Sequence, residues 1–212
     1  MDRKIVLATT NRGKLREFQN ILSDWNLLSI DNLVPDFHVV EGEESYVENA
    51  IIKAKKASEL TGLPAIADDS GIEVEALNGR PGVLSARYGG EELSTPKRNQ
   101  KLLNELKSLN AIKPADRQAR YRAVIVFLEH PAATPIITEA TVEGRISFEE
   151  KGTNGFGYDP VFEVTDSELQ SLDPRGPPLG SRTMAELPLD LKNRLSHRGR
   201  AIEKLKLALL KS

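Results

Sequence analysis

The sequence contains no cysteine, and this absence excludes several kinds of chemistry. The chain can form no disulfide, no thiolate metal site and no cysteine nucleophile. A metal ion, if one is bound, must therefore be held by oxygen or histidine ligands. The lack of cysteine also agrees with a reducing compartment, although it favours one only weakly.

The sequence also has no large excess of positive or negative charge. Lys and Arg number 29 against 31 Asp and Glu, which gives a formal net charge of −2. Such a chain has no overall field that would attract it to nucleic acid or to an anionic membrane. The apolar run at residues 5–8 is too short for a signal peptide or a membrane span. We expect a cytoplasmic protein with a small-molecule ligand and with no nucleic-acid or membrane partner.

The most informative stretch is residues 65–77, an apolar segment bounded by Leu63-Pro64 and Asn78-Gly79. These turn signals and the hydrophobic pattern predict a strand. Counting every second residue places Asp69, Glu73 and Glu75 on the side opposite the apolar residues Ile66, Ile72, Val74 and Ala76. We therefore expect the Asp69 side chain to point away from the core.

The pair Asp68-Asp69 has two interpretations. Adjacent carboxylates at the edge of a strand suggest a site for a divalent metal ion. An aspartate before Gly71 can instead cap a turn, and for an Asp-Asp pair taken alone this second interpretation is the more common one.

Residues 9–14 follow an expected buried strand at residues 5–8 and precede an expected helix. A polar loop between a strand and a helix N-terminus can bind an anion, because the first backbone N–H groups of the helix are free. Arg12 and Lys14 oppose the helix dipole there unless an anion compensates them. Phosphate fits this pattern, and a solvated loop with two exposed bases fits it equally well.

A further helix is predicted from Ser45, with Glu48 completing a capping box and Gly62 ending the helix. The apolar stripe of this helix comprises Val47, Ala50, Ile51, Ala54 and Ala57. The opposite face, with Glu48, Lys53, Lys55 and Lys56, is typical of a solvated surface. The loop before this helix carries Glu41, which can approach the Asp68-Asp69 strand edge.

The second half of the chain predicts a helix from Thr95, strands at residues 119–129 and 136–142, and a last helix from about Ser196. Residues 164–182 contain three prolines and predict a long surface loop. Phe156 lies between two glycines, so its ring either reaches the core or presents a face to a planar ligand.

Five motifs occur in one order along the chain: residues 9–14 (TTNRGK), 48–50 (ENA), 67–71 (ADDSG), 155–160 (GFGYDP) and 196–198 (SHR). In these motifs the chain resembles the inosine triphosphate pyrophosphatases, also called XTP/dITP diphosphatases. The resemblance covers nearly the whole length, and five motifs in register are far more specific than any one of them.

The resemblance implies an α/β fold with an elongated mixed β-sheet flanked by helices. It implies one domain over residues 1–212, with two lobes and a nucleotide cleft between them, and a homodimer. The implied reaction is the hydrolysis of deaminated purine nucleoside triphosphates (ITP, dITP and XTP) to the monophosphate and pyrophosphate, with Mg²⁺ as cofactor.

The resemblance also implies roles for individual residues. Asp69 is the implied proton acceptor and, with Glu41, a Mg²⁺ ligand, and Ser70 lies beside the substrate. The implied phosphate contacts are Thr9, Thr10, Asn11, Arg12, Gly13, Lys14 and Lys53. The implied base contacts are Phe156, Gly157, Tyr158, Asp159, Lys192, His197 and Arg198.

Two alternatives stay open at this point. A Maf-type nucleotide pyrophosphatase shares the loop and helix at the start of the chain but lacks the motif from Phe156 to Asp159. A nucleotide-binding sensor without turnover would have less need of two carboxylates, Glu41 and Asp69, next to a triphosphate.

Overall fold

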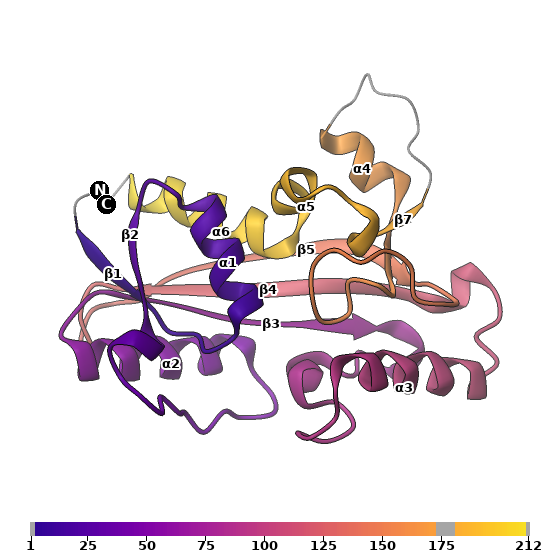
Figure 1. Ribbon diagram of the computed structural model, residues 1–212, viewed down its shortest axis with the longest axis horizontal. Coiled ribbons are helices and arrows are strands. Elements are labelled where there is room, and N and C mark those ends of the chain that lie inside the picture. The colour runs from indigo at the N-terminus through magenta and orange to yellow at the C-terminus, as the bar shows by residue number, and fades with distance from the viewer. Residues whose placement is uncertain (1–2, 173–180, 211–212) are drawn as a thin grey trace. The chain divides into compact units, whose positions relative to one another are not determined.

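The computed structural model describes residues 3–172 and 181–210, which form a mixed seven-stranded sheet flanked by helices (Figure 1). The sheet order is β2-β1-β3-β4-β5-β6-β7. The strands are β1 (Lys4–Leu7), β2 (Asn26–Ser29), β3 (Ala65–Val74), β4 (Gln118–Leu128), β5 (Ile136–Ile146), β6 (Phe162–Val164) and β7 (Arg182–Thr183). The helices are α1 (Arg12–Ile21), α2 (Tyr46–Thr61), α3 (Thr95–Ser108), α4 (Asp166–Leu172), α5 (Leu189–Leu195) and α6 (His197–Leu209). The expected fold class is confirmed.

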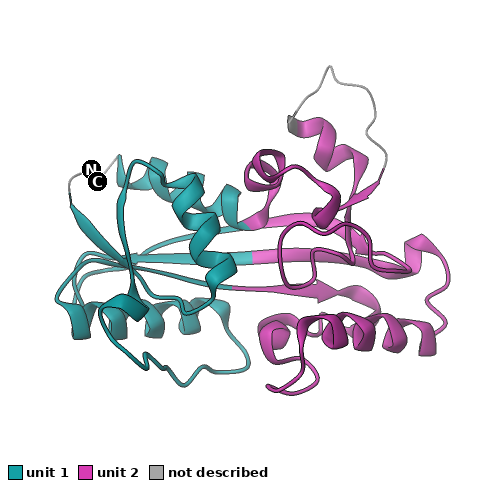
Figure 2. Cartoon of the chain, viewed as in Figure 1, with its two compact units in different colours: residues 1–69, 123–140, 198–212 teal, residues 70–122, 141–197 magenta. Residues whose placement is uncertain are grey.

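The chain divides into two compact units, coloured separately in Figure 2. Unit 1 comprises residues 1–69, 123–140 and 198–212, and unit 2 comprises residues 70–122 and 141–197. Strand β3 belongs to unit 1 as far as Asp69 and to unit 2 from Ser70. Each unit has its own cluster of buried apolar side chains, so each has its own core.

In unit 1, α1 and α6 lie on one side of the sheet and α2 lies on the other (Figure 1). The core on the side of α1 and α6 includes Phe18, Leu22, Ile125, Ile202 and Leu205, all almost fully buried. On the other side, alanines of α2 allow close packing against the sheet, since Ala50, Ala54 and Ala57 are completely buried. Both faces of this part of the sheet are therefore covered, so a residue on either face of β3 is buried.

The register of the parallel strands determines which loops meet. Leu7 of β1 pairs with Ile66 of β3, and the Ala8 N–H donates to the Ile66 carbonyl at 2.8 Å. Because parallel strands end at the same edge of a sheet, the loop after β1 lies beside the residues that follow Ile66. This places the start of α1 next to Asp68 and explains the contacts of Lys14 described below.

The core of unit 2 is built on the inner side chains of α3 and on residues of the strands. Leu102 and Leu106 of α3 are completely buried, as are Ile72, Val142 and Phe162 of the sheet. Helix α3 begins at Thr95 as predicted, with proline in its first turn, where the missing N–H costs no hydrogen bond.

Helix α2 confirms Ser45 as the N-cap and Gly62 as the end of the helix, and it corrects the predicted stripe. The Ser45 hydroxyl accepts from the Glu48 N–H, and Gly62 ends the helix at φ 67°. The prediction of a solvated face holds for Glu48, Lys55 and Lys56 but is wrong for Lys53, which is 9% exposed. The buried face is rotated toward Lys53 because a carboxylate of β3 balances its charge.

The predicted long loop at residues 164–182 is partly wrong. Its first part forms α4 (Asp166–Leu172), where the Thr165 hydroxyl accepts from the Glu168 N–H and Leu169 is buried. This threonine is an N-cap signal that the proline content of the segment obscured. Residues 173–180 lie outside the described residues. In the described ranges, no helix is both long enough and apolar enough to cross a membrane.

Candidate functional site

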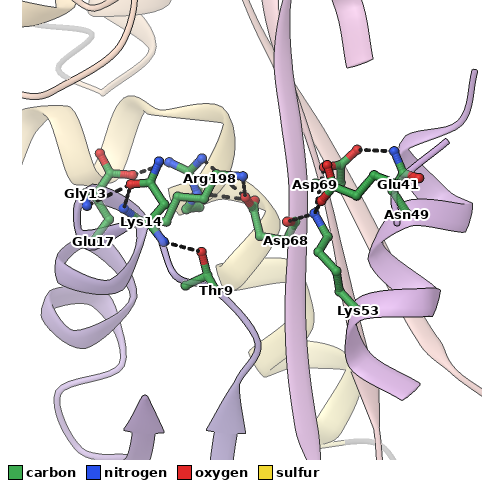
Figure 3. A network of polar contacts seen from close by, with 11 residues as sticks. Thr9, Gly13, Lys14, Glu17, Glu41, Asn49, Lys53, Asp68, Asp69 and Arg198 are labelled. Carbon is green, nitrogen blue, oxygen red and sulfur yellow. Dashed lines mark hydrogen bonds and ion pairs between the residues drawn. The ribbon is translucent and has the colours of Figure 1, made fainter. Parts of the chain in front are cut away.

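Two neighbouring aspartates of β3 carry the charged centre of unit 1. Asp68 is 1% exposed and Asp69 is 6% exposed, so the expectation that Asp69 leaves the core needs correction. The alternation itself holds, because the two side chains lie on opposite sides of the strand (Figure 3). Asp69 is nevertheless buried, since α2 covers its side of the sheet.

On the Asp69 side, one lysine lies between two carboxylates. The Lys53 ammonium donates to Asp69 Oδ1 at 2.8 Å and to the Asp68 carbonyl at 2.9 Å, and it pairs with Glu41 Oε1 at 2.9 Å. The structure thus brings together the predicted residues Glu41, Lys53 and Asp69. The Glu41 side chain is 34% exposed and so has access to solvent.

Burial raises the pKa of Asp69 above its usual range, although the charges of Lys53 and Lys14 act in the opposite direction. For Lys53, burial alone would lower the pKa, but the attraction of Asp69 and Glu41 outweighs burial and the pKa is raised. Two carboxylates that share one ammonium retain an excess of negative charge. This arrangement suits an additional cation.

Asn49 of α2 ties the two carboxylate segments together. Its amide oxygen accepts from the Gly42 N–H at 2.7 Å, and its amide nitrogen donates to the Gly42 carbonyl at 3.1 Å. The same nitrogen donates to Asp69 Oδ2 at 3.3 Å. Because Gly42 follows Glu41, this single buried side chain contacts both the acidic loop and the carboxylate of β3.

On the Asp68 side, two bases face two acids. Lys14 Nζ lies 2.6 Å from Asp68 Oδ2, and the Arg198 guanidinium lies 3.3 Å from Asp68 Oδ1. Arg198 also donates to the carboxylate of Glu17 on α1. Asp68, Glu17 and Arg198 are at most 5% exposed, so the charges of this group are balanced within the protein interior.

The pKa directions on this side follow from that balance. Burial acts to raise the pKa of Asp68, but the charges of Arg198 and Lys14 overcome it and hold the pKa well below the usual range. Burial lowers the pKa of Lys14, while Asp68 opposes this shift. The pKa of Arg198 is raised because Asp68 and Glu17 outweigh its burial. Asp68 is therefore a permanent anion at neutral pH.

The loop before α1 is partly satisfied by its own side chains. The Asn11 amide oxygen caps the helix by accepting from the Gly13 N–H at 2.8 Å and the Lys14 N–H at 3.1 Å. The Thr9 hydroxyl accepts from the Asn11 N–H at 3.2 Å. Thr10 and Arg12 are exposed. Asp68 explains why Lys14 is stable at a helix start, so the position of this base alone does not require an external anion.

In unit 2, Asp159 organises the glycine-rich segment that contains Phe156. Asp159 Oδ2 accepts from the Phe156 N–H at 2.7 Å and from Lys192 Nζ at 2.9 Å. A Cβ at Gly155, whose φ is 78°, would lie 2.1 Å from that oxygen, so only glycine fits there. Lys192 Nζ also lies 5.1 Å from the centre of the half-buried Phe156 ring, a cation–π contact.

The neighbouring residues Tyr158 and Gly157 are fixed by hydrogen bonds. The Tyr158 hydroxyl donates to the Ser85 carbonyl at 2.9 Å, and Asn99 of α3 donates to the Gly157 carbonyl at 3.2 Å. Ser70 is half-buried at the first position of unit 2. The segment of residues 155–159 is thus held in one backbone conformation while part of the Phe156 ring stays accessible.

His197 and Arg198 are adjacent in sequence but have different surroundings. The His197 ring stacks on Tyr121 at 4.5 Å with an interplanar angle of 6°, and the Tyr121 hydroxyl lies 3.5 Å from Asp159 Oδ1. His197 thus belongs to the cluster of unit 2 that contains Asp159. The Arg198 guanidinium contacts Glu17 and Asp68 in unit 1, and its role in base binding stays a prediction.

Three residues of these clusters had no role predicted from the sequence: Glu17, Asn49, which is part of the motif at residues 48–50, and Tyr121. A sequence signal existed for two of them. Glu17 is a lone acid beside the apolar position Phe18 of α1, and Asn49 is a poor helix former inside α2. Tyr121 lies in an apolar strand and gave no signal, because aromatic residues are common there.

The two carboxylates on the Asp69 side, Glu41 and Asp69, suit a divalent cation that takes its other ligands from substrate and water. Among residues 3–172 and 181–210, no group of three or more His, Asp or Glu side chains is arranged to hold a metal ion by itself. Mg²⁺ is usually bound by one or two protein carboxylates together with substrate phosphates and water. The pair Glu41 and Asp69 supplies these two carboxylates.

Comparisons with known proteins give a consistent answer. A model of the Ham1 family matches residues 5–208. A dITP/XTP pyrophosphatase of Thioalkalivibrio sulfidiphilus is 47% identical over 203 residues, covering 94% of each chain. One from Escherichia coli (strain K12) is 43% identical over 207 residues, covering 95% of each chain. A solved HAM1 protein structure from Coxiella burnetii has 40% identity and a TM-score of 0.81, covering 99% of this chain and 100% of that chain. The resemblance found in the motifs is confirmed, and the chain belongs to the Ham1 family.

Proposed function

We propose that this protein hydrolyses the deaminated purine nucleotides ITP, dITP and XTP to the nucleoside monophosphate and pyrophosphate, and so removes them from the nucleotide pool. Relatives named dITP/XTP pyrophosphatases match nearly the whole chain at 43% to 47% identity. The structural observation that carries the proposal is the pair Glu41 and Asp69, which share the single ammonium of Lys53. Family membership favours this activity over a Maf-type pyrophosphatase and over a sensor without turnover.

The proposed cofactor is Mg²⁺, held by Glu41 and Asp69 together with phosphate oxygens of the substrate. When bound, Mg²⁺ supplies positive charge that stabilises the phosphate oxygens as the anhydride bond breaks. Lys53 holds the two carboxylates close to each other, since it pairs with both.

Asp69 acts in this proposal as the general base. Its raised pKa brings its basicity closer to the working pH, which favours proton transfer from water. The oxygen of that water attacks the α-phosphorus, the bond from this phosphorus to the bridging oxygen of the β-phosphate breaks, and pyrophosphate leaves. The proton of the water passes to Asp69, and no covalent intermediate is required.

The phosphates are expected to contact the loop before α1, formed by Thr9, Thr10, Asn11, Arg12 and Gly13, together with Lys14. Asn11 already accepts from two amides of the first helical turn, so it holds this loop in shape. The cations Arg12 and Lys14 then supply charge to the leaving pyrophosphate.

The base is expected to contact the cluster of unit 2. Phe156 offers a partly exposed ring for stacking, and the other expected contacts are Gly157, Tyr158, Asp159, Lys192, His197 and Arg198. Hypoxanthine and xanthine carry a 6-keto acceptor where adenine carries a 6-amino donor. A donor that faces a donor leaves buried polar groups unpaired, at a cost of about 1 to 3 kcal/mol each, so adenine is rejected.

We also expect a homodimer, which analytical ultracentrifugation can test.

Product analysis tests the proposed reaction. ITP, XTP, GTP and ATP are incubated with the enzyme with and without Mg²⁺, and the nucleotides and phosphates are separated by chromatography. We expect IMP and pyrophosphate from ITP, faster turnover of ITP and XTP than of GTP and ATP, and dependence on the metal ion. Formation of IDP and orthophosphate as the main products would refute the proposal.

A further inference from the structure

Asn49 is an unusual residue at its position. It lies within α2 on the buried face and is 1% exposed, although asparagine is a weak helix former whose amide needs hydrogen-bond partners when buried. Its partners are not in its own helix. Both hydrogens of the amide and its oxygen are used by two other segments, the backbone of Gly42 and the carboxylate of Asp69.

The segment that Asn49 holds has no regular secondary structure. Residues 37–44, which include Glu41, contain no helix or strand, and Gly42, Glu43 and Glu44 are exposed. The ion pair between Glu41 and Lys53 is partly exposed on the acid side, so solvent screens the attraction between the two charges. The two hydrogen bonds between Asn49 and the Gly42 backbone constrain where the neighbouring Glu41 lies.

Asn49 also orients the second carboxylate. Asp69 Oδ1 accepts from Lys53 at 2.8 Å, whereas Asp69 Oδ2 accepts from Asn49 at 3.3 Å. With a different donor at each oxygen, the plane of the carboxylate is fixed. A neutral amide does this without adding charge, so it leaves the excess of negative charge in place for a cation.

We propose that Asn49 is a positioning residue that sets the separation and orientation of Glu41 and Asp69 for a shared divalent cation. The proposal rests on the proposed function, in which these two carboxylates hold Mg²⁺. Residues that orient metal ligands typically change metal affinity or activity by about 10- to 100-fold when mutated. Asn49 would act in this way without touching the metal ion or the substrate.

The test measures Mn²⁺ binding to the substrate-free protein by electron paramagnetic resonance, with Asn49→Ala, Asn49→Ser and the control Ser58→Ala. Ser58 lies on the same buried face of α2 and donates to the Leu63 carbonyl at 2.7 Å, away from the acids. We expect about a tenfold rise in the Mn²⁺ dissociation constant for both Asn49 variants and no change for Ser58→Ala. Thermal melts identify the temperature range in which each variant is folded.

A double-mutant cycle separates positioning from a general loss of stability. In the Glu41→Gln background, Asn49→Ala should have a smaller additional effect on Mn²⁺ binding, because the part of its effect that passes through Glu41 is already lost. At saturating Mg²⁺ the kcat of Asn49→Ala should recover to within a few-fold of wild type, since no reacting group is lost.

The outcomes distinguish this inference from the proposed function. If wild type and Asp69→Asn bind Mn²⁺ equally, the proposed metal site itself is wrong. If binding depends on Asp69 but both Asn49 variants bind Mn²⁺ like wild type, Asn49 does not position the two carboxylates and the inference is overturned, whatever the melting temperatures of the variants. The inference would also be overturned if the effects of Asn49→Ala and Glu41→Gln on Mn²⁺ binding were fully additive.

Discussion

The two sides of β3 in unit 1 differ in how their charges are balanced, although their central residues are neighbours. On the Asp68 side, two acids face two bases and all the carboxylates are buried. On the Asp69 side, two acids share Lys53, and Glu41 is partly exposed. The pKa of Asp68 is lowered and that of Asp69 is raised. The comparison indicates that a group with equal numbers of acids and bases stabilises the fold. A group with more acids than bases is suited to bind a cation and to accept a proton.

Substitution of Asp69 should have the largest effect on activity. Asp69→Asn keeps the shape of the side chain but removes the proposed general base, and we expect kcat to fall about 10²- to 10⁴-fold. Because the pKa of Asp69 is raised by burial, ionised Asp69 does not favour folding, and the melting temperature should change little. Steady-state kinetics with ITP at saturating Mg²⁺ and a thermal melt check both parts. Activity near wild type would exclude Asp69 as the base.

Substitution of Asp68 should have the largest effect on stability. Asp68→Asn removes the buried counter-charge that Lys14 and Arg198 share, and breaking a buried pair in this way typically costs about 3 to 5 kcal/mol. Urea unfolding at pH 7 measures the change in the free energy of unfolding. A loss below 1 kcal/mol would show that the group on the Asp68 side is not a structural one.

Glu41→Gln should act mainly on the metal requirement. The variant removes one of two proposed ligands but no proton acceptor, so we expect at least about a tenfold higher Mg²⁺ concentration for half-maximal rate. The kcat at saturating Mg²⁺ should remain within a few-fold of wild type. The exposed acid Glu43 of the same loop offers a matched control, Glu43→Gln, which should leave the Mg²⁺ dependence unchanged.

The pH dependence of stability gives a finer test of the Asp68 side. A carboxyl group whose folded pKa is lowered stabilises the protein above its unfolded pKa of about 3.9, and this stabilisation is lost as the pH falls through the folded value. The difference in unfolding free energy between wild type and Asp68→Asn should therefore be constant from pH 7 to 5. Below pH 4 it should shrink by about 1.4 kcal/mol per pH unit. A difference that grows on acidification would contradict the lowered pKa.

Much of the fold follows from local sequence signals. Ser45 and Gly62 delimit α2 because capping and a positive φ depend on nearby residues. The helical part of the 164–182 segment was missed because proline-rich composition outweighed one capping threonine. The burial of Lys53 could not be predicted from helical periodicity, because it depends on Asp69, a residue of another element.

The candidate site was predicted by resemblance more than by chemistry. The resemblance carried by the five motifs implied roles for Glu41, Lys53 and Asp69, and the structure brings these three residues together. Periodicity correctly placed Asp68 and Asp69 on opposite faces but could not assign their charge partners. Arg198 pairs with Glu17 across 181 positions of sequence, and no local pattern reveals such a contact.

The difference between the two sides of β3 can be tested most directly by Mn²⁺ binding to two matched variants, Asp69→Asn and Asp68→Asn. Both swaps remove one charge from neighbouring residues, and electron paramagnetic resonance at a temperature where both variants are folded measures the dissociation constant. We predict that Asp69→Asn raises the Mn²⁺ dissociation constant at least about tenfold. The dissociation constant of Asp68→Asn should stay within about twofold of wild type, because the charges around Asp68 are balanced among themselves. Equal weakening by the two variants would contradict the division of β3 into a structural and a cation-binding side.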